Sequence, residues 1–364
     1  MKMNDFIPVN EPMLNGNKKK YLNECIDTGW ISSEGPFIKR FEEGIASRVG
    51  RKYAVAVSNG TVAIDAAVTA LGIGYNDEVI MPAFTIISCI SQIIRLGAKP
   101  VLIDSNPFTW NMDVSQIESR ITSNTKAIMI VHIYGLPVDV DPILALAKKY
   151  RLNVIEDAAE MHGQTYKGRP CGGFGDISTF SFYPNKHITT GEGGMIVTDD
   201  EGLFVKSQSL RNLCFQPQRR FVHEELGWNM RMTNLQASLG VAQLEKLDEF
   251  VARKRAMGKL YTELFSDLQE YLELPLEKTE YAENIYWVYG LVLKSRVPFD
   301  ADVAMKKLMD LGIGTRPFFY PMHKQLVLQR MGLDNKFISC LKGKNKQNSS
   351  RLHNLRCARG KYGL

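Results

Sequence analysis

Residues 180–194 read FSFYPNKHITTGEGG, and they carry the strongest signal in the chain. A strand-like run ends near Ser181, a single lysine follows at Lys186, and a glycine-rich turn closes the stretch at 191–194. Because lysines are mostly solvated, an isolated Lys186 would be an ordinary loop residue. A lysine in such a turn can also supply the amine that forms a Schiff base with an aldehyde. The surrounding sequence separates these two interpretations.

Residues 153–157, NVIED, predict a short buried strand that ends in acids. The carboxyl ends of parallel strands face the crevice where α/β folds bind their ligands. Asp157 would therefore lie against a ligand, although a helix N-cap is an equal alternative for this residue. Glu160 follows closely enough to reach the same crevice.

A third pattern begins at residues 53–57, a predicted strand that leads into Ser58-Asn59-Gly60-Thr61 and an alanine-rich helix. Small residues at a helix N-terminus present free amides and the positive end of the helix dipole, both of which favour a phosphate. We expect Ser58, Gly60 and Thr61 at such a phosphate, with the Ser181 hydroxyl as a further donor. An ordinary N-cap is the alternative.

Together, a phosphate loop, an acid and a lysine at successive strand ends match the needs of pyridoxal 5′-phosphate (PLP). Lys186 would hold the cofactor aldehyde and act as the catalytic residue. Asp157 would keep the ring nitrogen protonated, and Glu160 would bind the ring hydroxyl. The sequence therefore predicts a PLP-dependent enzyme.

As an ordered set, these stretches resemble the sugar aminotransferases of the DegT/DnrJ/EryC1/StrS family, which are fold-type I PLP enzymes. The resemblance runs from about Ile7 to about His323. Its other carriers are IPVNEP (7–12), GWISSEG (29–35), PAFT (82–85), VHIYG (131–135), NMRMTN (229–234) and RPFFYPMH (316–323).

The resemblance implies further roles. Phe84 would stack on the cofactor ring, with ordinary core packing as the alternative. Asn229 matches the family residue that reaches the PLP phosphate of the neighbouring subunit, which implies a homodimer with shared active sites. Arg231 would fix that loop or contact the substrate. The expected substrate contacts are Trp30, Ser32, Ser33, Tyr183, Arg316, Tyr320 and His323.

Within the family, the 316–323 run and the acidic Glu160 make the chain similar to the GDP-perosamine synthases. That branch implies transfer of the amino group of L-glutamate to C4 of GDP-4-keto-6-deoxy-D-mannose, for a cell-surface polysaccharide. Lys186 would move the proton in both halves of a ping-pong reaction, first as base and then as acid.

Two other activities stay open at this point. One is amination of a UDP- or dTDP-linked keto sugar. The other is a PLP-dependent sugar 3-dehydratase, a branch in which histidine replaces the lysine; here His187 is adjacent, but Lys186 holds the motif position. A PLP-sensing regulator of this fold would carry a DNA-binding helix-turn-helix, and residues before Ile7 do not read as one.

Composition agrees with a cytoplasmic enzyme. The chain has 364 residues, 45% of them hydrophobic, which is enough for two domains. Six cysteines lack CxxC spacing, so we expect reduced thiols and no metal site. We expect no membrane segment, because no apolar run is long enough and no signal peptide is evident. Residues 342–364 contain seven Lys or Arg residues and no acid, so the net charge of +6 leaves −1 for the rest of the chain, which favours no nucleic acid.

Strand and helix patterns alternate along the chain, and a continuous apolar run such as 127–131 is typical of a strand buried on both faces. We predict an α/β fold with a mostly parallel sheet. Glu42 and Glu43 are expected on the solvated face of their helix. Helices are predicted at 17–28, 35–49, 61–71, 86–96, 114–121, 141–150 and 233–265, and strands at 53–57, 78–81, 99–103, 127–131, 153–155, 177–182 and 194–198.

Three regions are predicted. They are a large PLP-binding domain at 1–245, a smaller C-terminal α/β domain at 246–337, and a basic tail at 338–364. The tail departs from the family pattern after Phe337, and its polar composition predicts disorder. Either a shifted or truncated reading frame or a true variant end would explain it. Loss of the family's last helix would put activity itself in question.

Overall fold

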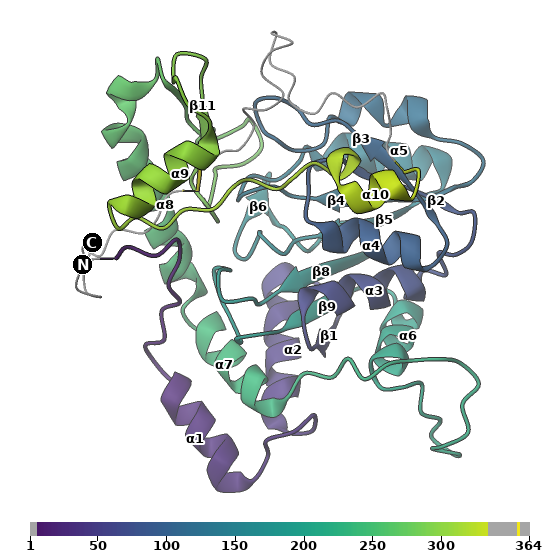
Figure 1. Ribbon diagram of the computed structural model, residues 1–364. Coiled ribbons are helices and arrows are strands. Elements are labelled where there is room, and N and C mark those ends of the chain that lie inside the picture. Colours follow the sequence, from purple (N-terminus) through teal and green to yellow (C-terminus); the bar gives the residue numbers. More distant parts are fainter. Residues whose placement is uncertain (1–5, 334–354, 357–364) are drawn as a thin grey trace.

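The computed structural model describes residues 6–333 and the two-residue strand at 355–356 (Figure 1). Apart from that strand, the predicted disordered tail lies outside the described residues. Among the described residues, no helix combines the length and apolarity that a membrane span requires.

A seven-stranded sheet forms the centre of the molecule, with strand order β1-β9-β8-β5-β4-β2-β3. Only β9 runs antiparallel to its neighbours, so the predicted mostly parallel α/β sheet is confirmed. The strands are β1 (Tyr53–Val57), β2 (Glu78–Pro82), β3 (Lys99–Ile103), β4 (Thr125–Val131), β5 (Asn153–Asp157), β8 (Ile177–Ser181) and β9 (Gly194–Thr198).

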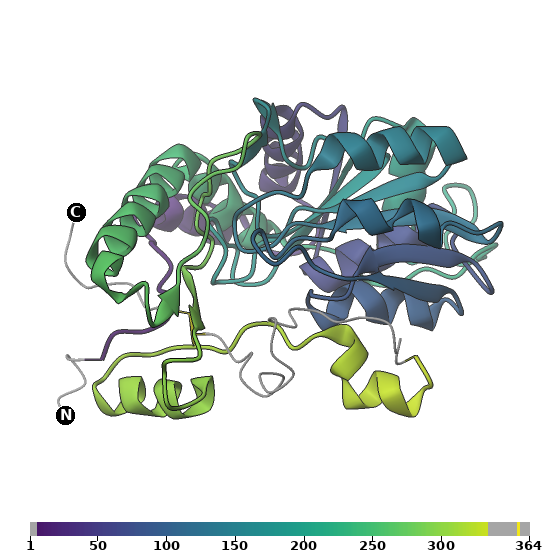
Figure 2. The same ribbon diagram turned by 90° about the horizontal axis from the view of Figure 1, so that it is seen from above.

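Helices cover both faces of this sheet (Figure 2). In β1, Ala54 and Ala56 enter the core cluster on one face, and Val55 and Val57 enter the cluster on the other. This alternation buries both faces of the strand. The first face carries α1 (Lys18–Thr28), α2 (Pro36–Val49), α5 (Val140–Tyr150) and α7 (Asn234–Leu244), and the second carries α3 (Gly60–Ala70), α4 (Ile87–Arg95) and α6 (Glu201–Arg211).

The predicted helix at 114–121 is replaced by two 3₁₀ turns, η2 (Val114–Gln116) and η3 (Glu118–Arg120). The Asp113 carboxylate accepts from the amide and hydroxyl of Ser115 and from the Gln116 side chain. These local bonds compete with helix propagation, so the prediction of a regular helix was wrong.

Two further expectations are corrected by long-range contacts. The helical stretch 233–265 is interrupted, because α7 ends at Leu244 and α8 spans Leu247–Leu264. At the break, Glu245 accepts from the Tyr21 hydroxyl at 2.7 Å, which ties it to α1. Glu42 is not on a solvated face, since its carboxylate accepts from the Ala56 amide at 2.8 Å and from Arg211 at 2.7 Å.

Beyond α8 a smaller core forms around Tyr286, Tyr289, Leu291 and Ala304. The segment that follows returns to the large sheet, where the Met322 amide donates to Ala83 O at 2.8 Å (Figure 1). The domain boundary at 246 stays a prediction. The remaining elements are the β6 (Thr165–Tyr166) and β7 (Arg169–Pro170) hairpin, η4 (Ser266–Leu268), β10 (Leu272–Glu273), β11 (Gly290–Leu293), α9 (Ala301–Asp310), η5 (Met322–Lys324), α10 (Leu326–Arg330) and β12 (Leu355–Arg356).

Candidate active site

A cavity of about 600 Å³ lies where β1, β4, β5 and β8 end and α3 begins. Parallel strands bring their carboxyl ends to one edge of the sheet, so residues far apart in sequence meet there. The cavity wall contains seven of the predicted site residues: Gly60, Thr61, Asp157, Glu160, Ser181, Tyr183 and Lys186.

The N-terminus of α3 forms one wall of the cavity. Asn59 caps this helix, because its side-chain oxygen accepts from the Val62 amide at 3.0 Å. The first-turn amides of Gly60 and Thr61 remain in the wall, where a helix cannot satisfy them itself. A Cβ on Gly60 would stand 2.6 Å from Ser181 Cβ, so only glycine lets the helix end approach β8. The result is an anion cradle of amides with a hydroxyl beside it.

Asp157 ends β5 as a buried acid in the same cavity. Its carboxylate accepts from the Ala159 amide at 3.0 Å and from the Cys89 thiol at 3.3 Å. Burial nevertheless raises the pKa of Asp157, and these donors, with Lys186 and His132 nearby, only partly offset it. A buried carboxylate whose charge is only partly compensated favours a cationic partner, such as a protonated ring nitrogen.

Lys186 is not a solvated loop lysine. Its side chain is 11% exposed, and Nζ lies 3.9 Å from Glu160 Oε1 and 4.0 Å from the centroid of the Trp287 ring. Glu160 is held in turn by the Tyr134 amide, which donates to Oε2 at 2.6 Å. The Trp287 indole N–H donates to Asn185 O at 2.8 Å, and this bond anchors the turn that carries the lysine.

The cavity therefore fits PLP on its own chemistry. An amine, a buried acid and an anion cradle line one cavity of suitable size. In addition, the buried Thr179 hydroxyl has no protein partner within the described residues, although it lines this wall. A buried polar group in that position indicates a missing ligand.

Sequence reasoning missed part of the wall. Trp287 comes from the region beyond α8 and carries no motif that links it to Lys186. Thr85, Ser88 and His132 lie just after predicted strands, at the sheet edge that carries the other site residues. Their position in the sequence could therefore have identified them as wall residues. The missed polar and aromatic wall residues are Asn59, Thr85, Ser88, His132, Thr179, Asn185, Glu192, Trp287 and Phe319.

Two residues predicted to contact the cofactor lie elsewhere. Phe84 packs in the core, with its ring 5.9 Å from Tyr134 and 6.2 Å from Phe318, and its neighbour Thr85 lines the cavity instead. The core-packing alternative therefore applies to Phe84, because its buried side chain belongs to the core cluster that contains residues of α3 and α4. Ser58 is absent from the described cavity wall and uses its amide to bind Met230 O at 2.8 Å.

The predicted substrate contacts do not converge on this cavity. Of the seven, Tyr183 alone is in its described wall. Arg316 lines an adjoining cavity of about 310 Å³ that shares Tyr183. Trp30 and Ser32 bind Asn234 through their carbonyl oxygens at 2.7 and 2.6 Å. Tyr320 and His323 belong to neither described wall.

Asn229 and Ser33 lie on another part of the surface. Asn229 is exposed and makes a β-bridge to Asn212. Ser33 lines a cavity of about 430 Å³ together with Arg211, Arg220 and Arg231. Within that cavity Arg231 donates to Asn212 Oδ1 at 2.6 Å, so it does fix the loop, as one of its two expected roles requires.

His132, Glu156 and Cys171 form a buried cluster that could in principle bind a metal. The Val138 amide donates to His132 Nδ1, which leaves the proton on Nε2 to be donated to Glu156 at 3.1 Å. Glu156 also accepts from the amides of residues 172 and 174 and from the hydroxyl of residue 178. Because these bonds occupy both ring nitrogens of His132 and both carboxylate oxygens of Glu156, we interpret the cluster as a structural network.

The model of the DegT/DnrJ/EryC1/StrS aminotransferase family matches residues 12–338. The chain is 45% identical over 318 residues to the GDP-perosamine synthase of Escherichia coli O157:H7, covering 87% of this chain and 86% of that protein. It is 36% identical over 332 residues to the putative pyridoxal phosphate-dependent aminotransferase EpsN of Bacillus subtilis, covering 89% and 84%. Among solved structures, an aminotransferase from Psychrobacter cryohalolentis superposes with a TM-score of 0.85 at 30% identity, covering 97% and 93%.

Proposed function

The chain belongs to the DegT/DnrJ/EryC1/StrS aminotransferase family, and on that basis we propose that it aminates a nucleotide-linked 4-keto-6-deoxy sugar with L-glutamate. The proposed acceptor is GDP-4-keto-6-deoxy-D-mannose, and the product is GDP-perosamine. Relatives with 41 to 45% identity over most of the chain carry the name GDP-perosamine synthase, which supports this choice. Synthesis of a cell-surface polysaccharide is the proposed context.

The enzyme is PLP-dependent, and its own residues divide the work. Asp157 would pair with the ring nitrogen, the 60–61 amides with Ser181 would hold the phosphate, and Lys186 would bond to the aldehyde carbon. When bound, PLP supplies an electron sink for the carbon that loses its proton.

The observation that carries the proposal is the placement of Lys186. Its amine lies between Glu160 and the Trp287 ring, in the same cavity as Asp157. Once released from the cofactor, this amine would remove the α-proton of the amino donor and later deliver a proton to the sugar carbon that accepts nitrogen. Glu160, held by the Tyr134 amide, would keep the amine oriented between the two positions.

The absorption spectrum of the purified protein before and after L-glutamate is the direct test. A visible band of lysine-bound cofactor that disappears on addition is expected, and Lys186→Ala should bind PLP without that band and without turnover. A panel of GDP-, UDP- and dTDP-linked keto sugars, read by mass spectrometry, then identifies the acceptor. An active Lys186→Ala protein, or a deoxy product without added nitrogen, would contradict the proposal.

We propose further that two copies share their active sites. Asn229 is exposed and outside both described cavity walls of its own chain, which suits a residue that serves a neighbour. The loop that carries it and the 26–31 segment expose an unusual number of large apolar side chains. These are Ile26, Trp30, Ile31, Phe221, Val222, Leu226 and Trp228.

Mixed dimers test this sharing. Lys186→Ala and Asn229→Ala chains are each expected to be inactive or weak as homodimers. After they are refolded together, a hybrid dimer contains one site with both native residues, so activity should reappear. Mixing that restores nothing, in dimers verified by native mass spectrometry, would contradict the shared site.

We also propose that the enzyme acts in the cytoplasm. Cys25, Cys89, Cys171 and Cys214 are free and buried. Buried thiols without disulfide partners suit a reducing compartment.

A further inference from the structure

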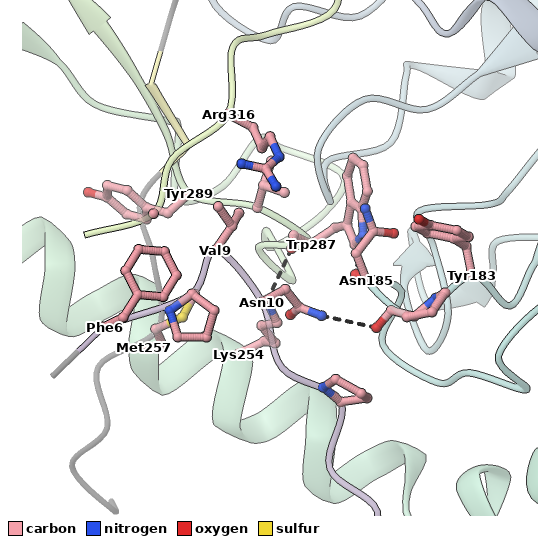
Figure 3. Close-up of a pocket in the computed structure, with 15 residues that line it drawn as sticks. Phe6, Val9, Asn10, Tyr183, Asn185, Lys254, Met257, Trp287, Tyr289 and Arg316 are labelled. Atoms are coloured by element: carbon pink, nitrogen blue, oxygen red, sulfur yellow. Dashed lines mark hydrogen bonds between the residues drawn. The ribbon is translucent and has the colours of Figure 1, made fainter. Parts of the chain in front are cut away.

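Two groups that lie beside the Lys186 amine are both held by one residue, Tyr134. Glu160 Oε1 lies 3.9 Å from Lys186 Nζ, and Glu160 Oε2 accepts from the Tyr134 amide at 2.6 Å. The Trp287 ring centroid lies 4.0 Å from the same Nζ and 5.9 Å from the ring centroid of Tyr134. Figure 3 shows Trp287 beside Asn185, whose carbonyl oxygen accepts from the indole N–H at 2.8 Å. Tyr134 itself is buried and does not belong to the described cavity wall, so it acts on the lysine through these neighbours.

Tyr134 also holds Phe319, which lines the active-site cavity from the segment that returns to the large sheet. The Phe319 amide donates to the Tyr134 hydroxyl at 2.9 Å, and the two ring centroids are 5.2 Å apart. Phe319 stacks in turn on Trp287, with ring centroids 6.4 Å apart and ring planes at 26°. Wall residues from distant parts of the chain therefore meet at one buried tyrosine.

The backbone at Tyr134 has an unusual conformation for an aromatic residue. The Leu136 amide donates to Ile133 O at 3.2 Å and closes a tight turn, whose central residues have φ of 59° at Tyr134 and 103° at Gly135. Positive φ at both central positions is typical of a type I′ turn, in which Asn-Gly is a favoured pair. A bulky side chain is disfavoured there, so the fold keeps Tyr134 against its conformational preference. Strain of this kind beside an active site indicates a functional constraint.

Gly135 brings the segment that carries Trp287 against this turn. Gly135 O accepts from the Ile285 amide at 3.1 Å. A Cβ at Gly135 would stand 2.8 Å from the Trp287 amide nitrogen, so only glycine allows this approach. The turn therefore fixes how the Tyr134 ring meets the Trp287 ring.

We propose that Tyr134 is a positioning residue that sets how closely Glu160 and Trp287 approach the catalytic amine. A carboxylate and an aromatic face both favour a positive charge on the lysine nitrogen, so their displacement makes that nitrogen easier to deprotonate. The inference rests on the proposed function in that this nitrogen is the one that bonds to the cofactor. Asp157 and His162 also interact electrostatically with the lysine, and the variants below leave both residues unchanged.

A pH titration of the visible band of lysine-bound cofactor, in the full-length holoenzyme, tests this role. The band is lost as pH rises and the nitrogen of Lys186 gives up its proton. Tyr134→Asn suits the left-handed turn but removes the ring, whereas Tyr134→Leu fills more of the space of the ring but suits the turn less. Each variant should lower the midpoint of the titration by about 0.5 pH unit, the shift that loss of one cation–π contact would cause. Either variant alone decides the test if the other does not fold.

Two substitutions of tyrosine by phenylalanine locate the effect in the ring. Tyr134→Phe keeps the ring and loses the hydroxyl that accepts from the Phe319 amide, so it should retain the wild-type midpoint. Tyr166→Phe is the matched control elsewhere in the chain. It removes a hydroxyl that donates to Asp139 at 2.5 Å, outside the described wall of the active-site cavity, and should also leave the midpoint unchanged.

The role is overturned if either folded variant without the ring titrates like the wild type. It is also overturned if Tyr134→Phe or Tyr166→Phe shifts the midpoint as far as Tyr134→Asn does, because loss of the ring would then not be the cause. The midpoint is read without an amino donor, so failure of the proposed function is seen separately, as a wild-type band that does not respond to L-glutamate. A wild type that forms no such band would overturn both proposals.

Discussion

The thiol of Cys89 donates a hydrogen bond to Oδ2 of Asp157 across 3.3 Å. Cys89 lies on α4 and is fully buried, and its Sγ is also 3.4 Å from the Thr85 hydroxyl. Burial, followed by the charge of Asp157, raises the pKa of the Cys89 thiol well above its ordinary value, so it remains a neutral donor. Because Asp157 is the acid proposed to meet the cofactor nitrogen, Cys89 is a positioning residue behind it.

Replacing Cys89 tests this role. Cys89→Ala removes the donor and should weaken PLP binding by about three- to tenfold, in line with one lost hydrogen bond to a charged group. It should also shift the pH profile of the visible cofactor band, because Asp157 loses a bond that favours its ionised form. Cys89→Ser keeps a donor and should restore both. Equal behaviour of the serine and alanine variants would mean that Cys89 only fills space.

Asp157→Asn should separate stability from function. The pKa of Asp157 is raised above 3.8 in the folded cofactor-free chain, so the folded state binds a proton that the unfolded state releases. Stability of that chain therefore falls as pH rises from 3.8 through the raised value, and it declines no further above it.

The asparagine variant lacks this pH dependence. At pH 8 its cofactor-free form should be more stable than the wild type by about 1 kcal/mol, while PLP should stabilise it far less. Urea unfolding with and without PLP, at several pH values, measures both quantities. If the cofactor-free variant were less stable than the wild type, the buried charge of Asp157 would not be destabilising the folded chain, and the prediction would be wrong.

Trp287 supports Lys186 in two ways that substitution can separate. Trp287→Phe keeps a ring beside the amine but loses the indole donor to Asn185 O, a bond of about 1 kcal/mol. Trp287→Leu also loses the cation–π contact. We expect about fivefold lower kcat/KM for phenylalanine and a larger loss for leucine, measured for the L-glutamate half-reaction. A leucine variant that matches the phenylalanine variant would exclude a role for the ring.

Glu156 is expected to act on stability rather than chemistry. It follows Ile155 on β5 and accepts four hydrogen bonds on the face opposite Asp157. Glu156→Ala should destabilise the chain by about 3–5 kcal/mol, because several buried donors lose their acceptor. The exposed Glu43, paired with Lys39 at 3.7 Å, is the control, and Glu43→Ala should cost less than about 0.5 kcal/mol. Urea unfolding compares the two, and similar losses would refute the prediction.

Local sequence patterns predicted much of the fold and the centre of the site. The strand that ends at Val57 is an apolar run, and Val154-Ile155, Ile177 and Phe180 supply the apolar part of the strands that end at Asp157 and Ser181. Short segments of this kind are typical of buried strands. Since parallel strands align their carboxyl ends, the loops after them had to converge. This is why the sequence alone predicts that Gly60, Asp157 and Lys186 meet at one edge of the sheet, where they line the same cavity.

Other features depended on contacts that local patterns do not encode. Phe84 is predicted to contact the cofactor but lies in the core. Consecutive residues of an extended chain point to opposite faces of a sheet, so a shift of one residue decides between the two positions. Glu42 and the helix break at Glu245 are set by partners more than a hundred residues away, Arg211 and Tyr21.

The sequence by itself determined the order of strands and helices, the family, and which residues can carry PLP chemistry, because these follow from short-range periodicity and residue type. The tertiary structure was needed to bring Trp287 to Lys186, to direct Cys89 at Asp157, and to place Tyr134 beside Trp287. Each of those contacts joins distant segments, and its geometry depends on how whole elements pack rather than on any local pattern.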